Sequence, residues 1–183
     1  AYPASGVSLV KGVVVDNNEV YDSTVGIRVG NEWHSITGDV DIEAVLTNNY
    51  VHDNVDHGIS ITDSGAEDGS SVTVTGHNNT VENNGNGYYV FEDNSTSEED
   101  DARITVDVER DAISSNDIGV LVESASPSPV DSFQSVAVTD SNIENNAADG
   151  VRNTVGDLTV DATRNWWNAS DGPNGAGPGS GDG

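Results

Sequence analysis

Apolar residues recur along this chain with a spacing of about thirty residues. At five places an apolar anchor follows an Asn-like residue by two positions, and successive anchors lie 31, 30, 32 and 30 residues apart. A glycine comes six or seven positions after each anchor. The anchors are Val20, Val51, Val81, Ile113 and Ile143, and the glycines are Gly26, Gly58, Gly87, Gly119 and Gly150. Five copies in register indicate a structural repeat.

Within each repeat, short segments alternate between apolar and polar residues. One such pair follows each of the first four glycines, as in Ile27/Val29 and Ile59/Ile61, and another opens the repeat, as in Ile104/Val106. Segments of this kind, rich in Val and Ile and separated by Asn, Asp and Gly, predict short strands joined by tight turns. No stretch has a sustained helical period. We therefore predict an all-β parallel β-helix, a solenoid of about six turns of roughly 30 residues.

Polar residues recur at two positions of the repeat, one before the anchor and one between the anchor and the glycine. Asn tolerates a left-handed backbone, and identical side chains stacked along the axis can hydrogen-bond to each other and to turn backbone. We interpret these positions as a structural polar ladder rather than a row of ligands. Its members are Asn18, Asn49, Asn79, Asp111 and Ser141, and then Asn54, Asn84, Asn116 and Asn146, with Asp22 at the second position of the first turn.

The charge is strongly acidic, because 32 Asp and Glu residues stand against 6 Lys and Arg residues and give a formal charge of −26. This balance argues against nucleic acid and anionic membranes as partners. It is typical of proteins that stay soluble in molar salt, and an ordinary acidic extracellular domain is the alternative. The chain has no Cys, which excludes disulfides and thiolate metal sites. No apolar run suffices for membrane insertion, and the start at Ala1 without Met suggests a processed product.

The C-terminal segment 165–183 begins Asn-Trp-Trp and continues into a Gly-Pro stretch. With the repeat over 12–165, it resembles right-handed parallel β-helix proteins of the pectate-lyase-like class, especially secreted and cell-surface proteins of haloarchaea. The resemblance implies a right-handed β-helix domain over 1–167 and a cap or linker over 168–183. Further strand residues usually follow in that family, so we expect a trimmed chain or part of a longer protein. Trp166 and Trp167 are predicted to plug the end of the core, with a sugar-stacking platform as the alternative.

Two features of the sequence could support an enzymatic activity. The segment Asp56-His57-Gly58-Ile59-Ser60-Ile61 is similar to the Gly-His-Gly-Leu-Ser-Ile segment of polygalacturonase-type hydrolases, but the repeat already explains all of it except His57. The Asn-Thr-Asp, Asp-Asp and Arg-Ile-Lys elements of that family are missing, and with them the paired carboxylates that glycoside hydrolysis needs. A lyase of this fold would need Arg or Lys, for which Arg110 and Arg103 flank one strand. We expect no catalytic residues, with His57 and Arg110 as the alternative.

Other candidate sites lie in the connections between strands. No cofactor is expected, although Glu98, Asp100 and Asp101 could hold a structural calcium ion instead of forming a solvated charge run. His34, His52 and His77 lack convergent partners, and Trp33 is a candidate exposed aromatic residue. The sequons place possible glycosylation at Asn78, Asn94 and Asn168.

These observations favour an extracellular structural or adhesive domain of a halophile surface protein. An uncapped first turn around Val13-Val14-Val15 could pair with another subunit and produce a fibre. The expected partners are further copies of the chain, other cell-surface proteins or glycans. The alternative function is a polysaccharide-active enzyme, lyase or hydrolase, or a carbohydrate-binding module.

Overall fold

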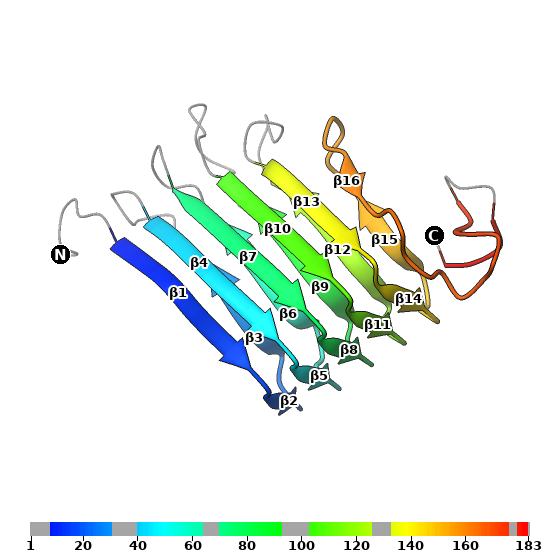
Figure 1. The fold of residues 1–183 in the computed structure, drawn as a ribbon, viewed down its shortest axis with the longest axis horizontal. Helices are drawn as coiled ribbons and strands as arrows, with labels where there is room; N and C mark the ends of the chain where they lie inside the picture. Colours follow the sequence, from blue (N-terminus) through cyan, green and yellow to red (C-terminus); the bar gives the residue numbers. More distant parts are fainter. Residues whose placement is uncertain are drawn as a thin grey trace.

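The fold is a parallel β-solenoid built from three sheets (Figure 1). The structure is a computed structural model that describes residues 8–30, 40–63, 70–92, 103–125, 133–175 and 179–182. Within these ranges the chain forms strands and turns and no helix, as the sequence predicts. Each strand pairs in parallel with its counterpart one repeat later, so every sheet runs along the axis of the solenoid.

The three sheets take one strand each from every repeat. The first sheet contains β1 (Ser8–Asp16), β4 (Val40–Thr47), β7 (Ser71–His77), β10 (Arg103–Glu109), β13 (Phe133–Thr139) and β16 (Val160–Asp161). The second contains β2 (Glu19–Tyr21), β5 (Tyr50–His52), β8 (Thr80–Glu82), β11 (Ala112–Ser114) and β14 (Asn142–Glu144). The third contains β3 (Val25–Gly30), β6 (His57–Asp63), β9 (Asn86–Glu92), β12 (Ile118–Ser124) and β15 (Asp149–Asn153).

The predicted number of about six turns is too high for the described residues. The sheets hold six, five and five strands, so the last strand of the first sheet, β16, has no successors in the other two. The described chain after β16 makes one bridge to the strands of the solenoid, between Asn142 and Trp166, and then leaves the solenoid path. Sequence periodicity did not reveal this end, because Leu158 and Val160 still follow the alternating pattern of an opening strand.

The core consists of apolar columns that run from turn to turn. The predicted anchors lie directly opposite one another in the second sheet, and Val51, Val81, Ile113 and Ile143 are completely buried. The residues after the glycines form another column in the third sheet, where Ile59 pairs with Tyr88. Burial of one Val or Ile side chain contributes about 1.5–3 kcal/mol. The repeated columns are therefore a major source of the stability of the solenoid.

Two hydrogen-bonded ladders line the corners on either side of the second sheet. In the corner ladder between the second and third sheets, the Oδ1 atom of each Asn accepts a hydrogen bond from the backbone N–H of the ladder residue one turn earlier. The N···O distance is 3.0 Å from Asn54 to Asn84, 3.0 Å from Asn84 to Asn116 and 3.1 Å from Asn116 to Asn146. The ladder between the first and second sheets runs in the same way through Asn18, Asn49, Asn79, Asp111 and Ser141. Each ladder side chain thus satisfies buried backbone of a neighbouring turn.

The left-handed residues of the corners are not the ladder residues themselves. Positive φ angles occur at the position just before each ladder residue, for example 57° at Asn78 and 56° at Asn83. The first turn has the same offset, so its ladder residue is Ser23 and not the predicted Asp22. Asp22 has the left-handed backbone, and Ser23 donates its N–H to Asn54 Oδ1 at 3.2 Å. Left-handed geometry therefore explains the polar residue before the ladder, whereas hydrogen bonding to backbone explains the ladder Asn.

The repeated glycine lies where the third sheet begins, against the ladder. A Cβ atom on Gly58 would lie 2.8 Å from Asn84 Nδ2 and 2.9 Å from the carbonyl oxygen of Gly87. Any side chain at this position would push the ladder amide away from its hydrogen-bonding partners. Glycine and ladder Asn thus recur together because each permits the other.

The C-terminal segment closes both ladders. Asn165 Oδ1 accepts the N–H of Ser141 at 2.9 Å, and Asp182 Oδ2 accepts the N–H of Asn146 at 2.8 Å. Trp167 is 7% exposed and belongs to the core cluster, whereas its neighbour Trp166 is 46% exposed. Of the two tryptophans expected at the end of the core, Trp167 therefore lies in the core and Trp166 lies on the surface.

We predict that Asn116→Ala destabilises the fold by about 3 kcal/mol or more. The Asn116 side chain accepts from Asn84 and donates to the carbonyl oxygen of Val81, and each buried polar group left without a partner costs about 1–3 kcal/mol. Chemical denaturation measures the loss. Asn142→Ala, at an exposed side chain of β14, is the control and should stay within about 0.5 kcal/mol of the parent. Equal effects of the two substitutions would refute a structural role for the ladder.

Candidate functional site

The repeat breaks inside the core at three residues that meet one another. Gly76 stands where the neighbouring turns have Leu46 and Val108, and Tyr88 stands in line with Ile59 and Val120. Asp111 replaces the Asn of the ladder. A Cβ atom at Gly76 would lie 3.3 Å from Tyr88 Oη, so the missing side chain makes room for the phenol ring. The three departures from the repeat therefore compensate one another.

The centre of this cluster is a buried carboxylate. Asp111 is 2% exposed. Its Oδ2 accepts the hydroxyl proton of Tyr88 at 2.5 Å, and its Oδ1 accepts the N–H of Asn79 at 2.8 Å. Burial raises the pKa of Asp111 to about 6, and the hydrogen bonds from Tyr88 and Asn79 oppose that rise. Burial next to Asp111 also raises the pKa of the Tyr88 phenol. The arrangement replaces a neutral ladder amide by an acid that can take up a proton.

A second cluster lies on the outside of the second sheet. His52 stacks on Tyr50 and Tyr21, with ring centroids 4.1 Å and 5.2 Å apart. Its Nδ1 lies 2.7 Å from Asp53 Oδ2, and its Nε2 lies 3.3 Å from Glu19 Oε1. The hydrogen bond with Asp53 is the main cause of a raised His52 pKa. These contacts come from two successive turns, and the carboxylates favour the protonated form of the stacked imidazole.

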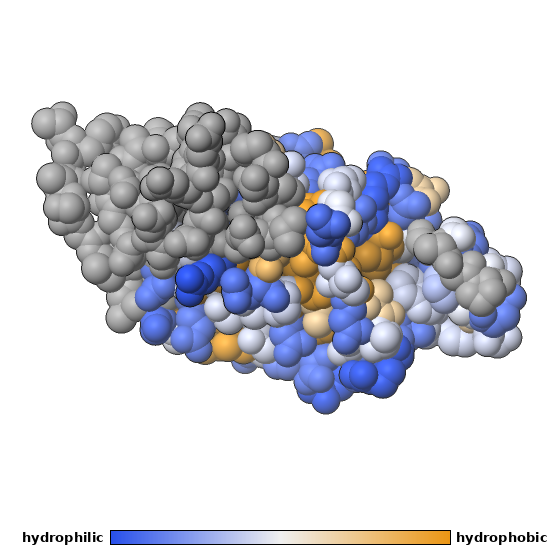
Figure 2. Space-filling model, turned by 90° about the horizontal axis from the view of Figure 1, so that it is seen from above, coloured by the Kyte–Doolittle hydropathy of each residue, from blue (hydrophilic) through white to orange (hydrophobic). Residues whose placement is uncertain are grey.

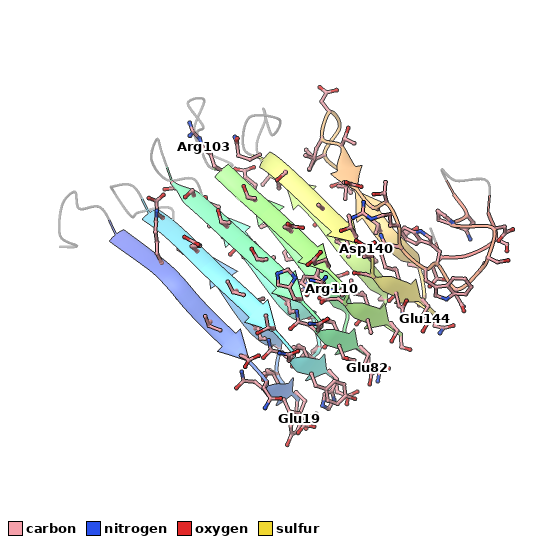
Figure 3. All side chains as sticks on the ribbon, in the orientation of Figure 1. Glu19, Glu82, Arg103, Arg110, Asp140 and Glu144 are labelled. Atoms are coloured by element: carbon pink, nitrogen blue, oxygen red, sulfur yellow. The ribbon has the colours of Figure 1, made fainter. Side chains whose placement is uncertain are left out.

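Carboxylates continue along the same outer face. Tyr50 Oη donates to Glu82 Oε1 at 2.5 Å, and this hydrogen bond is the main cause of a Tyr50 pKa raised to about 12. Figure 3 shows Glu19, Glu82 and Glu144 following the second sheet along the axis. The face thus combines aromatic rings with carboxylate acceptors.

A third cluster lies at the third sheet. His57 stacks on Tyr89 with a centroid distance of 4.2 Å, and Tyr89 stacks on Phe91 at 5.4 Å. The Nδ1 atom of His57 lies 3.0 Å from Asn86 Nδ2. Half-burial is the main cause of a lowered His57 pKa. His57 therefore belongs to a row of aromatic residues from two neighbouring strands.

The two alternative catalytic residues are placed at different parts of the solenoid. His57 begins β6 of the third sheet, whereas Arg110 follows β10 at the corner before the second sheet. Arg110 has a left-handed backbone and is paired with Glu109. Figure 3 shows Arg110 near Asp140 and shows Arg103 at the opposite end of β10. The structure does not bring His57 and Arg110 together as an acid–base pair.

The remaining candidates are partly outside the described residues. Glu98, Asp100, Asp101, Asn94, Trp33 and His34 all lie there. In the parts of the chain that the structure describes, no three His, Cys, Asp or Glu side chains form a group that could hold a metal ion. Asn78 and Asn168 are exposed at left-handed corners, and the Asn168 amide donates to Asn145. His77 is on β7 and contacts Glu109 at 3.1 Å.

Sequence reasoning missed the aromatic rows because the residues that form them are far apart in the chain. Tyr89 and His57 lie 32 positions apart, which is close to the length of one repeat. This separation is the signal in the sequence that places the two rings on neighbouring turns. Gly76, Tyr88 and Asp111 could have been detected as three breaks in neighbouring turns. The fact that they meet required the three-dimensional register.

The chain has no recognised relatives in three comparisons with known proteins. No family model matches it, and neither a curated protein nor a solved structure does. The function proposed below therefore rests on the solenoid architecture and on the side-chain clusters described above.

We predict that Asp111→Asn removes a pH-dependent part of the stability. The folded state binds the Asp111 proton more tightly than the unfolded state, whose pKa is near 3.8. This contribution is complete below about pH 3.8 and is lost as the pH rises through about 6, with a size on the order of 3 kcal/mol. Denaturation of both proteins from pH 4 to pH 7 should show the variant gaining relative to the parent. A constant difference between the two proteins would contradict the prediction.

We also predict that His52 and His57 titrate in opposite directions from the ordinary pKa of 6.5. Carboxylate partners stabilise protonated His52, so its contribution to stability is present below pH 6.5 and is lost as the pH rises through its raised pKa. Burial disfavours protonated His57. NMR titration of the two imidazole rings measures both values, and Asp53→Asn should lower the His52 pKa alone. Coincident titration of the two rings in the parent would contradict the assignment.

Proposed function

We propose that the chain is a structural or adhesive domain of a secreted or cell-surface protein from a halophilic microbe, of archaeal type. We also propose that the solenoid is right-handed, like the β-helix proteins of the pectate-lyase-like class. The observation that carries it is the pair of side-chain ladders, which connect every turn from Asn18 to Asn165 and from Ser23 to Asp182. A fold whose neighbouring turns are joined in this way is suited to act as a stiff spacer.

The surface supports a role in concentrated salt. On the face drawn in Figure 2, hydrophilic residues lie below and to the right of a hydrophobic patch, and the chain carries a formal charge of −26. Molar salt shortens the screening length from about 10 Å at 0.1 M to about 3 Å at 1 M, which removes most of the repulsion between carboxylates. The described residues contain no helix that could span a membrane.

Self-association through the first turn remains part of the proposal. Val13 and Val14 of β1 are 38% and 63% exposed, and β1 pairs only with β4 among the described strands. An exposed strand edge with apolar side chains is a surface for contact with a second copy. Because Asn165 and Asp182 close the ladders at the other end, growth into a fibre would require contacts other than simple end-to-end stacking of ladders.

The second candidate function is binding to a polysaccharide. The stacked row of His57, Tyr89 and Phe91 favours it, because aromatic side chains combine large apolar faces with polar edges. A carbohydrate-binding module would use this row to bind sugar rings. A lyase or hydrolase would in addition need acid–base residues close to it.

Electron microscopy and denaturation in 0.1 M and 2 M salt test the structural role. We expect rod-shaped particles and a higher denaturation midpoint in 2 M salt, because repulsion between the carboxylates is then screened. Incubation with polyuronates should give no cleavage products. Salt-independent stability would refute adaptation to salt, and cleavage abolished by His57→Ala would refute the structural role in favour of an enzyme. Retention on a polysaccharide column that is lost in Tyr89→Ala would support the second candidate.

A further inference from the structure

The three sheets end differently at the C-terminal side of the solenoid. The first sheet ends with the short β16, and the second receives a bridge from Trp166 to Asn142. The third sheet ends with β15, which pairs only with β12 among the described residues. The outer edge of β15 is therefore unpaired among the described residues, whereas the other two sheets continue by a further strand or bridge.

Trp167 explains why the chain does not continue along β15. A Cβ atom on Gly150 would lie 3.0 Å from Trp167 Cζ3, whereas the equivalent atom on Gly119 would meet the carbonyl oxygen of Gly150 at 2.4 Å. The indole ring thus occupies the position where the next turn would place its corner. Beyond it the chain moves away toward Pro173, and Figure 1 shows this C-terminal segment beyond the last turn.

A hollow of about 620 Å³ lies at the open edge. The outer side of β15 forms one wall, with Val151 and Arg152, and Ala162, Trp167 and Pro173 line the others. Val151 stands in register with Val120 and continues the apolar column of the third sheet. The volume lies within the range of about 300–1,000 Å³ that is typical of ligand pockets.

We propose that this hollow binds an extended peptide strand that runs parallel to β15. A strand is the occupant that can pair with the backbone of β15, and such pairing is an established mode of peptide recognition. One apolar side chain of the peptide would pack between Val151 and Trp167. The charge of the chain, −26, favours a neutral or basic strand over an acidic one.

The sequence of the third sheet supplies a suitable probe. The capped peptide Ile-Ser-Ile-Thr, which reproduces residues 59–62, would place an isoleucine against Val151 and a serine beside Arg152 if it adopts the register of the solenoid. It begins after the position opposite Gly150, where the indole ring of Trp167 lies. The control peptide has proline in place of the serine, because proline cannot donate a backbone hydrogen bond within a strand.

Hydrogen–deuterium exchange of the full chain, with and without the peptide, tests the proposal. We expect amide exchange in residues 149–153 to slow at least tenfold in the presence of the peptide, and the proline peptide to bind at least tenfold more weakly in calorimetry. Thr163 also lines the hollow, and Thr163→Trp, which adds a large side chain there, should weaken binding to the same extent. Val55→Asp is the matched control, since Val55 is 74% exposed at the corner between β5 and β6.

Three results would overturn the proposal. The first is equal binding of the serine and proline peptides, and the second is protection of β1 to β3 instead of β15. The third is unchanged binding in Thr163→Trp, whose fold is checked by its circular dichroism spectrum. The inference does not depend on the proposed structural role, because a spacer domain without a peptide site would keep its salt-dependent stability.

Discussion

The hydrogen bond from a backbone N–H to a ladder side chain one turn later is the interaction on which the solenoid depends. A corner between two short strands leaves backbone groups that no strand can satisfy, and these groups are buried between turns. The amide of Asn84, for example, donates to Asn116 and to the carbonyl oxygen of Val51. Without such side chains, each corner would bury unsatisfied donors and acceptors at a cost of about 1–3 kcal/mol apiece. The apolar columns could not then stack at this spacing.

The same interaction explains which changes the repeat tolerates. Ser141 and Asp111 keep the acceptor oxygen that the preceding turn requires, although neither is an amide. Asp111 lacks the donor function of Asn, and Tyr88 brings a hydroxyl group to its second oxygen. Gly76 in turn provides the space for Tyr88. A ladder position can therefore change chemically when two neighbouring positions change with it.

Much of the fold could be predicted from the sequence, because its period appears directly in the spacing of Val20, Val51 and Val81. The parallel pairing of these anchors follows from the repeat, and it is present in the structure. The exact role of the corner residues could not be predicted, since left-handed geometry and hydrogen bonding both select Asn and occur at adjacent positions. The aromatic rows were not predicted either, because the contact between His57 and Tyr89 depends on which side of the sheet each residue faces.

In-register pairing also restricts where an acidic chain can place its carboxylates. Strand neighbours in a sheet lie about 4.8 Å apart, so an acidic residue opposite another would bring two like charges close together. Among the strand pairs of the described residues, two acidic residues stand directly opposite each other once, at the buried Asp63 and Glu92. Elsewhere neutral residues intervene: Ser114 separates Glu82 from Glu144, and Ala137 separates Asp107 from Asp161. Spacing by two turns puts these charges about 10 Å apart, close to one screening length at 0.1 M salt. High acidity and close stacking are compatible here because the carboxylates of paired strands almost never stand directly opposite one another.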